Sequence, residues 1–273
     1  MATDTTGRLR FARATFVLLL LLTGILSLHG CEFIDDDLSD GICDDEDLSN
    51  GIDGGGDPIP LKEAKLIIEH NATDEDTGFQ GFIDSDGWER LDITGPDGVV
   101  LTLLGRGKLG ALGLTELFFE TVEPPNADVP IEDVLAALPE GEYTIGGPTV
   151  DGMRTIGTAR LTHRIPAGPV LLSPAEGATV PASNLVMSWS PVTQTITGEA
   201  VTIIRYQLIV AKDEEPHPNA IGKIGMSIYV PASVTSVTVP NELLEPATRY
   251  EWEVLAIEES GNQTLSSGEF TTE

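Results

Sequence analysis

Apolar and polar residues alternate one by one over several segments of this 273-residue chain. Between positions 250 and 256 every second residue is apolar, and Glu251 and Glu253 fall between them. Because successive side chains of an extended strand point to opposite faces, this period of two predicts half-buried β-strands. The same period recurs earlier, in the triplets Leu185, Met187, Trp189 and Tyr206, Leu208, Val210.

The composition extends this prediction to most of the chain. It includes 29 glycines and 18 prolines but only 5% aromatic residues, which indicates many turns and is typical of β-sandwiches. Residues 61–165 also indicate β structure, which begins at 64–70. Apolar runs at 99–104 and 114–119 follow, with turn signals at Asp86-Gly87, Pro96-Asp97-Gly98 and Glu140-Gly141. One short helix is expected at 130–138, where Pro139 ends it.

A stretch rich in proline and glycine at residues 165–169 divides the two β regions. The expected fold is therefore all-β, with two tandem β-sandwich domains at 58–166 and 167–273. Each would contain just over 100 residues, which suits a small sandwich.

The order of features over 168–273 resembles a fibronectin type III domain. The residues that carry the resemblance, and that would form its core, are Trp189, Tyr206, Leu244 and Tyr250. The segment Leu244-x-Pro246-x-Thr248-x-Tyr250 matches the tyrosine corner, which implies that the Tyr250 hydroxyl bonds to backbone a few residues upstream. Members of this family mediate adhesion, act as spacers or form receptor ectodomains. The loop that in some members carries Arg-Gly-Asp here reads Glu258 to Gln263, so integrin binding is not implied.

In the preceding domain, residues 139–145 resemble the closing strands of bacterial Ig-like extracellular domains.

The N-terminal 30 residues have the pattern of an export signal. Arg8, Arg10 and Arg13 precede an apolar run at 14–28, which is shorter than the roughly 20 residues that span a bilayer. The ending Leu28-His29-Gly30-Cys31 resembles the lipobox of bacterial lipoproteins, which implies cleavage before Cys31 and lipidation of its thiol and amine. An ordinary secretory signal and an uncleaved anchor are the alternatives.

Residues 31–57 are expected to form a disordered acidic tether. Positions 32–57 contain 11 acidic residues and no basic one, and such a segment cannot bury a core. With Cys31 acylated, Cys43 has no intramolecular partner for a disulfide. Glu32 stands where enteric bacteria use Asp for inner-membrane retention, which favours the outer membrane or cell surface.

The formal charge of −29 argues against nucleic-acid binding, which needs a basic surface. The expected partners are a protein or a glycan of the cell envelope, with membrane contact through the lipid anchor only.

The strongest candidate site lies between residues 71 and 89. Asp74, Asp76, Asp84 and Asp86 could supply oxygen ligands to Ca²⁺ if their two loops met, and Trp88 could then stack on a sugar. The alternative is that the acids form solvated turns while Trp88 packs inward. Otherwise no cofactor is expected.

No catalytic motif is found. His70, His163 and His217 lie far apart, and the chain has neither a nucleophile elbow nor a phosphate loop. The leading hypothesis is a non-enzymatic binding, adhesion or scaffolding protein. A Ca²⁺-dependent carbohydrate-binding protein is the first alternative, and a small hydrolase or an accessory subunit of one is the second.

Overall fold

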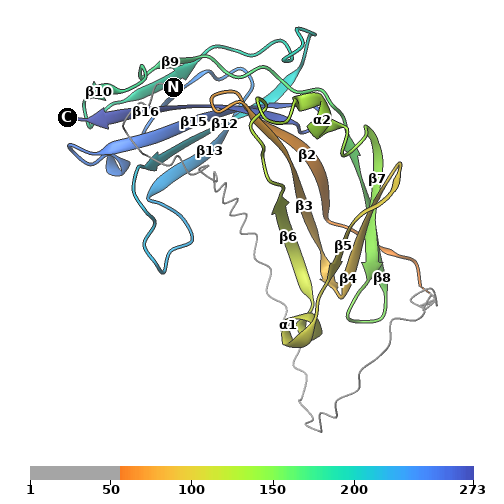
Figure 1. The fold of residues 1–273 in the computed structure, drawn as a ribbon. Coiled ribbons are helices and arrows are strands. Elements are labelled where there is room, and N and C mark those ends of the chain that lie inside the picture. Colours follow the sequence, from red (N-terminus) through yellow and green to blue (C-terminus); the bar gives the residue numbers. More distant parts are fainter. Residues whose placement is uncertain (1–55) are drawn as a thin grey trace, which may run out of the picture. The chain divides into compact units, whose positions relative to one another are not determined.

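The computed structural model describes residues 56–273, and its elements are labelled in Figure 1. The fold is all-β, as predicted. The first half contains β1 (Ile59–Pro60), β2 (Glu63–Asn71), β3 (Asp76–Trp88), β4 (Arg90–Gly95), β5 (Gly98–Leu104), α1 (Gly107–Leu112), β6 (Leu114–Glu120), α2 (Ile131–Leu135), β7 (Gly141–Pro148) and β8 (Arg154–Leu161). The second half contains β9 (Leu171–Ser173), β10 (Ala178–Val180), β11 (Val186–Trp189), β12 (Ile203–Lys212), β13 (Gly225–Pro231), β14 (Ser236–Thr238), the 3₁₀ turn η1 (Asn241–Leu243), β15 (Arg249–Glu258) and β16 (Gln263–Thr272).

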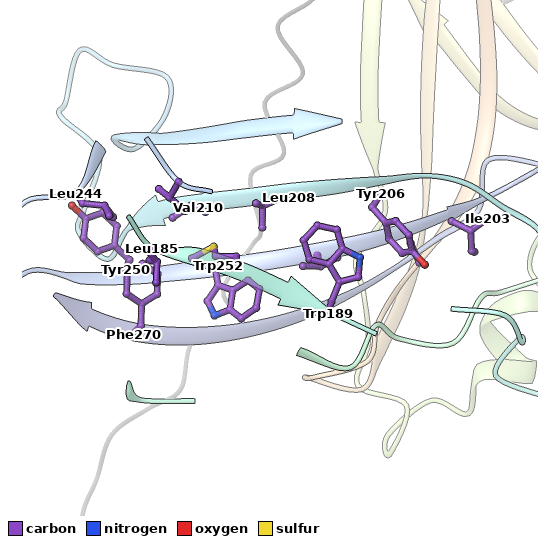
Figure 2. Close-up of a cluster of buried hydrophobic side chains, with 14 residues drawn as sticks. Leu185, Trp189, Ile203, Tyr206, Leu208, Val210, Leu244, Tyr250, Trp252 and Phe270 are labelled. Atoms are coloured by element: carbon purple, nitrogen blue, oxygen red, sulfur yellow. The ribbon is translucent and has the colours of Figure 1, made fainter. Parts of the chain in front are cut away.

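The second half is a sandwich of two sheets. Strands β9, β11 and β14 form one sheet, and β13, β12, β15 and β16 are successive strands of the other. Their apolar side chains pack into one core, shown in Figure 2, in which the rings of Trp189 and Tyr206 meet edge to face at 5.6 Å. Leu185 and Met187 are at most 7% exposed while Val186 between them is 46% exposed, so the predicted alternation is confirmed.

Tyr250 forms the corner that the fibronectin resemblance implies. Its buried hydroxyl donates to the carbonyl oxygen of Leu243 and accepts from the amide of Glu245, both at 2.8 Å. Its ring stacks on Phe270 with a centroid separation of 5.2 Å. Together with the three-plus-four strand arrangement, this corner supports a fibronectin type III-like domain.

The first half is a second sandwich. One sheet has the order β1-β8-β7-β4-β5, and the other contains β2, β3 and β6. Both contribute to a separate core that includes Ile68, Trp88 and Tyr143. The hydroxyl of Tyr143 donates to the carbonyl oxygen of Pro139 at 2.7 Å, so the closing strands of this sandwich also contain a tyrosine that bonds to backbone upstream.

Two local features differ from the sequence prediction. The helix expected before Pro139 is confirmed as α2, but a second helix, α1, occupies a glycine-containing segment for which no helix was predicted. A Cβ on Gly110 would lie 2.5 Å from the Gly105 carbonyl, so this turn packs against backbone in a way that a local pattern does not reveal. At Asp86-Gly87 the chain does not turn, because a register shift lets β3 continue to Trp88.

The two sandwiches share a sheet across the boundary at residues 165–169. Strand β16 pairs in parallel with β2, with Gln263 opposite Glu69 and Leu265 opposite Asn71. The eight-stranded sheet therefore includes strands of both halves.

The loop between β15 and β16 reinforces this junction. Asn262, 1% exposed, accepts a hydrogen bond from the amide of Ile68 at 2.9 Å. Its amide donates to the carbonyl oxygens of Thr162 at 2.8 Å and Arg164 at 3.0 Å. The loop that carries Arg-Gly-Asp in some fibronectin domains is here partly buried against the first sandwich.

Cys31, Cys43 and nearly all of the acidic segment at 31–57 lie outside the described residues. Of the helices within 56–273, none is long and apolar enough to cross a membrane.

Candidate functional site

The four acids predicted to bind calcium lie toward the two ends of β3. Asp74 precedes this strand and Asp76 begins it, whereas Asp84 and Asp86 lie near its end. Eight residue steps separate Asp76 from Asp84, which corresponds to roughly 26 Å along an extended strand. The structure therefore does not bring the four carboxylates together.

Both acids near the end of β3 interact with the same lysine. The Nζ atom of Lys62 lies 3.7 Å from Asp84 and 3.2 Å from Asp86. Trp88, the predicted stacking residue, is only 2% exposed and belongs to the core of the first sandwich. Its ring faces are therefore covered by protein.

Three other carboxylates do meet. Glu69 on β2, Glu120 at the end of β6 and Glu123 just beyond it each place one oxygen so that all three oxygens lie within 4.8 Å of one another. Strand β3 separates β2 from β6, and Gly78, which pairs with Glu69, leaves room between them. A Cβ at Gly78 would lie 2.7 Å from Glu123 Cγ. We call Glu69, Glu120 and Glu123 the carboxylate cluster.

Burial raises the pKa of acids in and near this cluster. Desolvation raises the pKa of Glu69 to about 7 and that of Glu123 to about 8, and the neighbouring negative charges add to both shifts. Desolvation and the charge of Asp74 also raise the pKa of Asp76 to about 6. At neutral pH the carboxyl groups of Glu69 and Glu123 are therefore protonated in a substantial part of the molecules.

Two amide side chains enclose the cluster. Gln80 donates to Glu120 at 2.8 Å, and Gln263 on β16 donates to Glu69 and, at 3.3 Å, to Gln80. The buried Oε1 atom of Glu123 accepts no hydrogen bond. With oxygen ligands only, this arrangement can share protons or hold a divalent cation such as Ca²⁺.

The sequence prediction did not find the carboxylate cluster. Glu69 stands in an alternating strand, where a charged residue is normally solvated, and Glu120 and Glu123 follow an apolar run. Only the β2-β3-β6 strand order places them together. A glycine between acidic segments, Gly78, was the one sequence feature that could have indicated the cluster. It does not specify how β2, β3 and β6 align with one another.

The three histidines within residues 56–273 contact different parts of the fold. His70 lies 2.9 Å from the Thr77 hydroxyl, and burial lowers the pKa of its imidazole. His163 lies 2.8 Å from the carbonyl oxygen of Leu138. Within the loop 214–223, His217 accepts from the amide of Asn219 at 3.2 Å.

A cavity of about 450 Å³ lies beside α2. Apolar residues such as Ile131 and Ile196 line it. Its charged or ionisable lining residues are Glu132, Glu140, His163, Arg164 and Glu199. Arg164 donates to the carbonyl oxygen of Ala200 at 2.6 Å, which fixes it to backbone.

Exposed apolar side chains gather along the segment from β5 to β6. Strands β5 and β6 lie at the edges of their respective sheets, and α1 connects them (Figure 1). Along this apolar edge, the exposed fraction reaches 66% for Leu109 and 74% for Leu112. The other members are Val99, Val100, Leu104 and Phe118. Exposed groups of this kind are typical of interaction surfaces.

No protein-family model and no curated protein matches the chain. Solved structures that it resembles include the fibronectin domains FN1–FN3 of chicken CNTN1, with 11% identity and a TM-score of 0.29 over 79% of this chain and 65% of that one. A tetra-tandem repeat from the extending region of a large adhesion protein gives 14% identity and a TM-score of 0.26 over 77% and 50%. A 1.5-MDa bacterial ice-binding adhesin gives 13% and 0.25 over 79% and 65%. The fold assignment depends on the strand pairing and on the Tyr250 corner.

Proposed function

We propose that this chain is a lipid-anchored protein of the bacterial cell envelope that presents its two β-sandwich domains for non-enzymatic binding to a protein partner. The observation that carries the binding half of this proposal is the apolar edge formed by β5, α1 and β6. Edge strands leave backbone groups unpaired, and exposed leucines beside them favour contact with another protein.

The anchoring half depends on the residues Leu28 to Cys31 and the acidic segment that follows them. Acylation at Cys31 with more than one chain would hold the protein firmly, since each buried methylene contributes about 0.8 kcal/mol. The 11 acidic residues of positions 32–57 would keep the intervening chain solvated and hold the sandwiches away from the bilayer.

Membrane fractionation tests the anchor. Wild type is expected in the membrane fraction and the Cys31→Ala variant in the soluble fraction, with Cys43→Ala as the matched control that stays with membranes. Equal partitioning of Cys31→Ala and wild type would remove the anchoring half of the proposal.

Capture from envelope extracts tests the binding surface. The double variant Leu109→Asp/Leu112→Asp replaces two exposed side chains of the apolar edge and is expected to lose the proteins that wild type retains. Ile221→Asp is the control, because Ile221 is 75% exposed but lies in the loop 214–223. Retention of the same proteins by the double variant and the control would contradict binding through this edge.

Ca²⁺-dependent carbohydrate binding is a second candidate function, and the carboxylate cluster is the observation that favours it. The ligands would be Glu69, Glu120 and Glu123. They would replace the four acids expected from the sequence, which are Asp74, Asp76, Asp84 and Asp86. On this hypothesis millimolar Ca²⁺ raises the melting temperature of wild type and not of Glu123→Gln. Asp84→Asn, at the other end of β3, should keep the full shift, and a wild-type protein without any shift would exclude this function.

A further inference from the structure

A gap interrupts one edge of β16. The strand pairs with β2 from Gln263 to Leu265 and with β10 from Phe270 to Thr272. Within the described part of the chain, no strand pairs with this edge at the residues between. There the backbone amides of β16 donate to side-chain oxygens instead of to a neighbouring strand. The amide of Ser267 donates to Thr73 Oγ1 at 2.9 Å, and that of Glu269 donates to Glu176 Oε2 at 3.0 Å.

A cavity of about 350 Å³ lies at this gap. Thr73 and Glu176 line it together with Ser266, Ser267 and Trp252. This volume lies at the lower end of the range of roughly 300–1,000 Å³ in which small-molecule sites are found.

The indole of Trp252 presents an unused hydrogen-bond donor to this cavity. Trp252 is 1% exposed, and its Nε1 atom donates to no acceptor in the described structure. A buried donor without an acceptor destabilises the protein, and an acceptor on a ligand would remove that cost.

Gly268 keeps the space above this donor open. It lies opposite Trp252 in the β15-β16 pair, and a Cβ on it would lie 3.0 Å from Trp252 Nε1 and 3.1 Å from Glu176 Oε2. The indole donor and the carboxylate acceptor therefore converge on the place where Gly268 lacks a side chain. Glu176 is exposed, so its carboxylate can move to admit a ligand.

The lining indicates the chemistry of the ligand. It contains no basic residue and includes one carboxylate, which disfavours anions. The hydroxyls of Thr73, Ser266 and Ser267 can each donate or accept, and Leu171 adds an apolar wall. A molecule with several neutral hydroxyl groups and an apolar face matches this set, because each hydroxyl can accept from the indole and donate to the carboxylate.

We propose that this cavity binds a neutral sugar, either free or at the end of a glycan. The proposal goes beyond the protein binding proposed above, because it uses a site separate from the apolar edge. Trp252 would donate to a sugar hydroxyl and Glu176 would accept from one, while Gly268 provides the space.

The test is a binding titration on the full-length protein in a detergent that contains no sugar. Saturation-transfer NMR with glucose, galactose, mannose and N-acetylglucosamine, each at up to tens of millimolar, is expected to give a signal with at least one of them. Trp252→Phe removes the donor but keeps a ring, and it should weaken that binding about tenfold. Gly268→Ala places a methyl group between the indole donor and the Glu176 carboxylate and should abolish it.

Two matched controls separate the site from general effects on folding. Trp189→Phe changes a tryptophan of the same core whose Nε1 is also buried without an acceptor but which does not line the cavity. Gly222→Ala adds a methyl group where nothing lies within 4 Å. Both should bind the sugar as wild type does.

The proposal is overturned if none of the four sugars binds wild type, or if Trp252→Phe and Gly268→Ala, folded by circular dichroism, bind it as well as the controls do. Membrane fractionation and partner capture on Gly268→Ala report separately on the proposed function. If Gly268→Ala loses sugar binding but still fractionates with membranes and still captures its protein partner, the effect belongs to this cavity alone.

Discussion

One hydroxyl group fixes the segment that crosses between the two sheets of the C-terminal sandwich, from β14 to β15. The phenol of Tyr250 satisfies both the carbonyl oxygen of Leu243 and the amide of Glu245, and its ring is fully buried. Buried backbone groups that lose their partners cost more than an average hydrogen bond contributes. At the scale of a residue, stability therefore depends on a few side chains that bond to backbone outside regular pairing.

Tyr250→Phe is expected to lower the free energy of unfolding by about 2 kcal/mol, because it leaves a buried carbonyl and amide without their partner. Urea denaturation monitored by tryptophan fluorescence measures the loss. Tyr229→Phe is the control, since Tyr229 is 44% exposed, and it should change stability by less than about 0.5 kcal/mol. Equal effects of the two changes would contradict a special role for the corner.

At the scale of elements, the β2-β3-β6 order places the carboxylates of Glu69, Glu120 and Glu123 together and partly out of water. Strand pairing fixes this arrangement. The apolar contacts and backbone hydrogen bonds of the sheet offset the electrostatic cost of bringing three carboxylates together. The cost varies with pH because the native state holds protons that the unfolded chain releases.

The stability of the fold is expected to fall as the pH is raised from about 5 to about 8. In the native state the pKa of Glu69 is raised to about 7 and that of Glu123 to about 8, above the ordinary value of 4.5. Between pH 4.5 and about 8 the native state therefore binds more protons than the unfolded state. This contribution to stability is fully present below pH 4.5 and is lost as the pH rises. The expected loss is on the order of 2 kcal/mol, read from urea midpoints at successive pH values.

Glu123→Gln should flatten this dependence, because a neutral amide has no proton to lose. Asp84→Asn, which lies outside the cluster, should keep the wild-type slope. A slope that is the same in all three proteins would show that the cluster is not its source.

At the scale of the whole molecule, the junction between the sandwiches combines strand pairing with buried polar contacts. The Asn262 side chain alone bonds to Ile68, Thr162 and Arg164 of the first sandwich. Contacts of this density favour unfolding of both sandwiches as one cooperative unit.

Wild type is expected to give one calorimetric unfolding transition. Asn262→Ala leaves a buried amide and two carbonyl groups without partners, which should cost about 3 kcal/mol and separate the transition into two. Asn219→Ala, in the loop 214–223, is the control that should leave a single transition. Two transitions already in wild type would contradict the coupling.

Much of the fold could be predicted because strand periodicity is a local property. The alternating faces at Met187, Tyr206 and Trp252, the helix before Pro139 and the corner at Tyr250 all follow from short segments. Helix α1 could not be predicted in this way, because Gly110 packs against Gly105 backbone. The candidate site was less predictable still, since the acids named from the sequence are separated along β3 and different carboxylates meet.

By itself, the sequence determined the all-β class and the faces that strands bury, and it predicts an export signal and a tether near the N-terminus. These follow from the chemistry of neighbouring residues. Only the tertiary structure decided that Glu69 meets Glu123, that Trp252 faces a cavity beside Gly268 and that Asn262 joins the two sandwiches. The physical reason is that strand pairing selects these neighbours over separations as long as the 194 residues between Ile68 and Asn262, which no local pattern encodes.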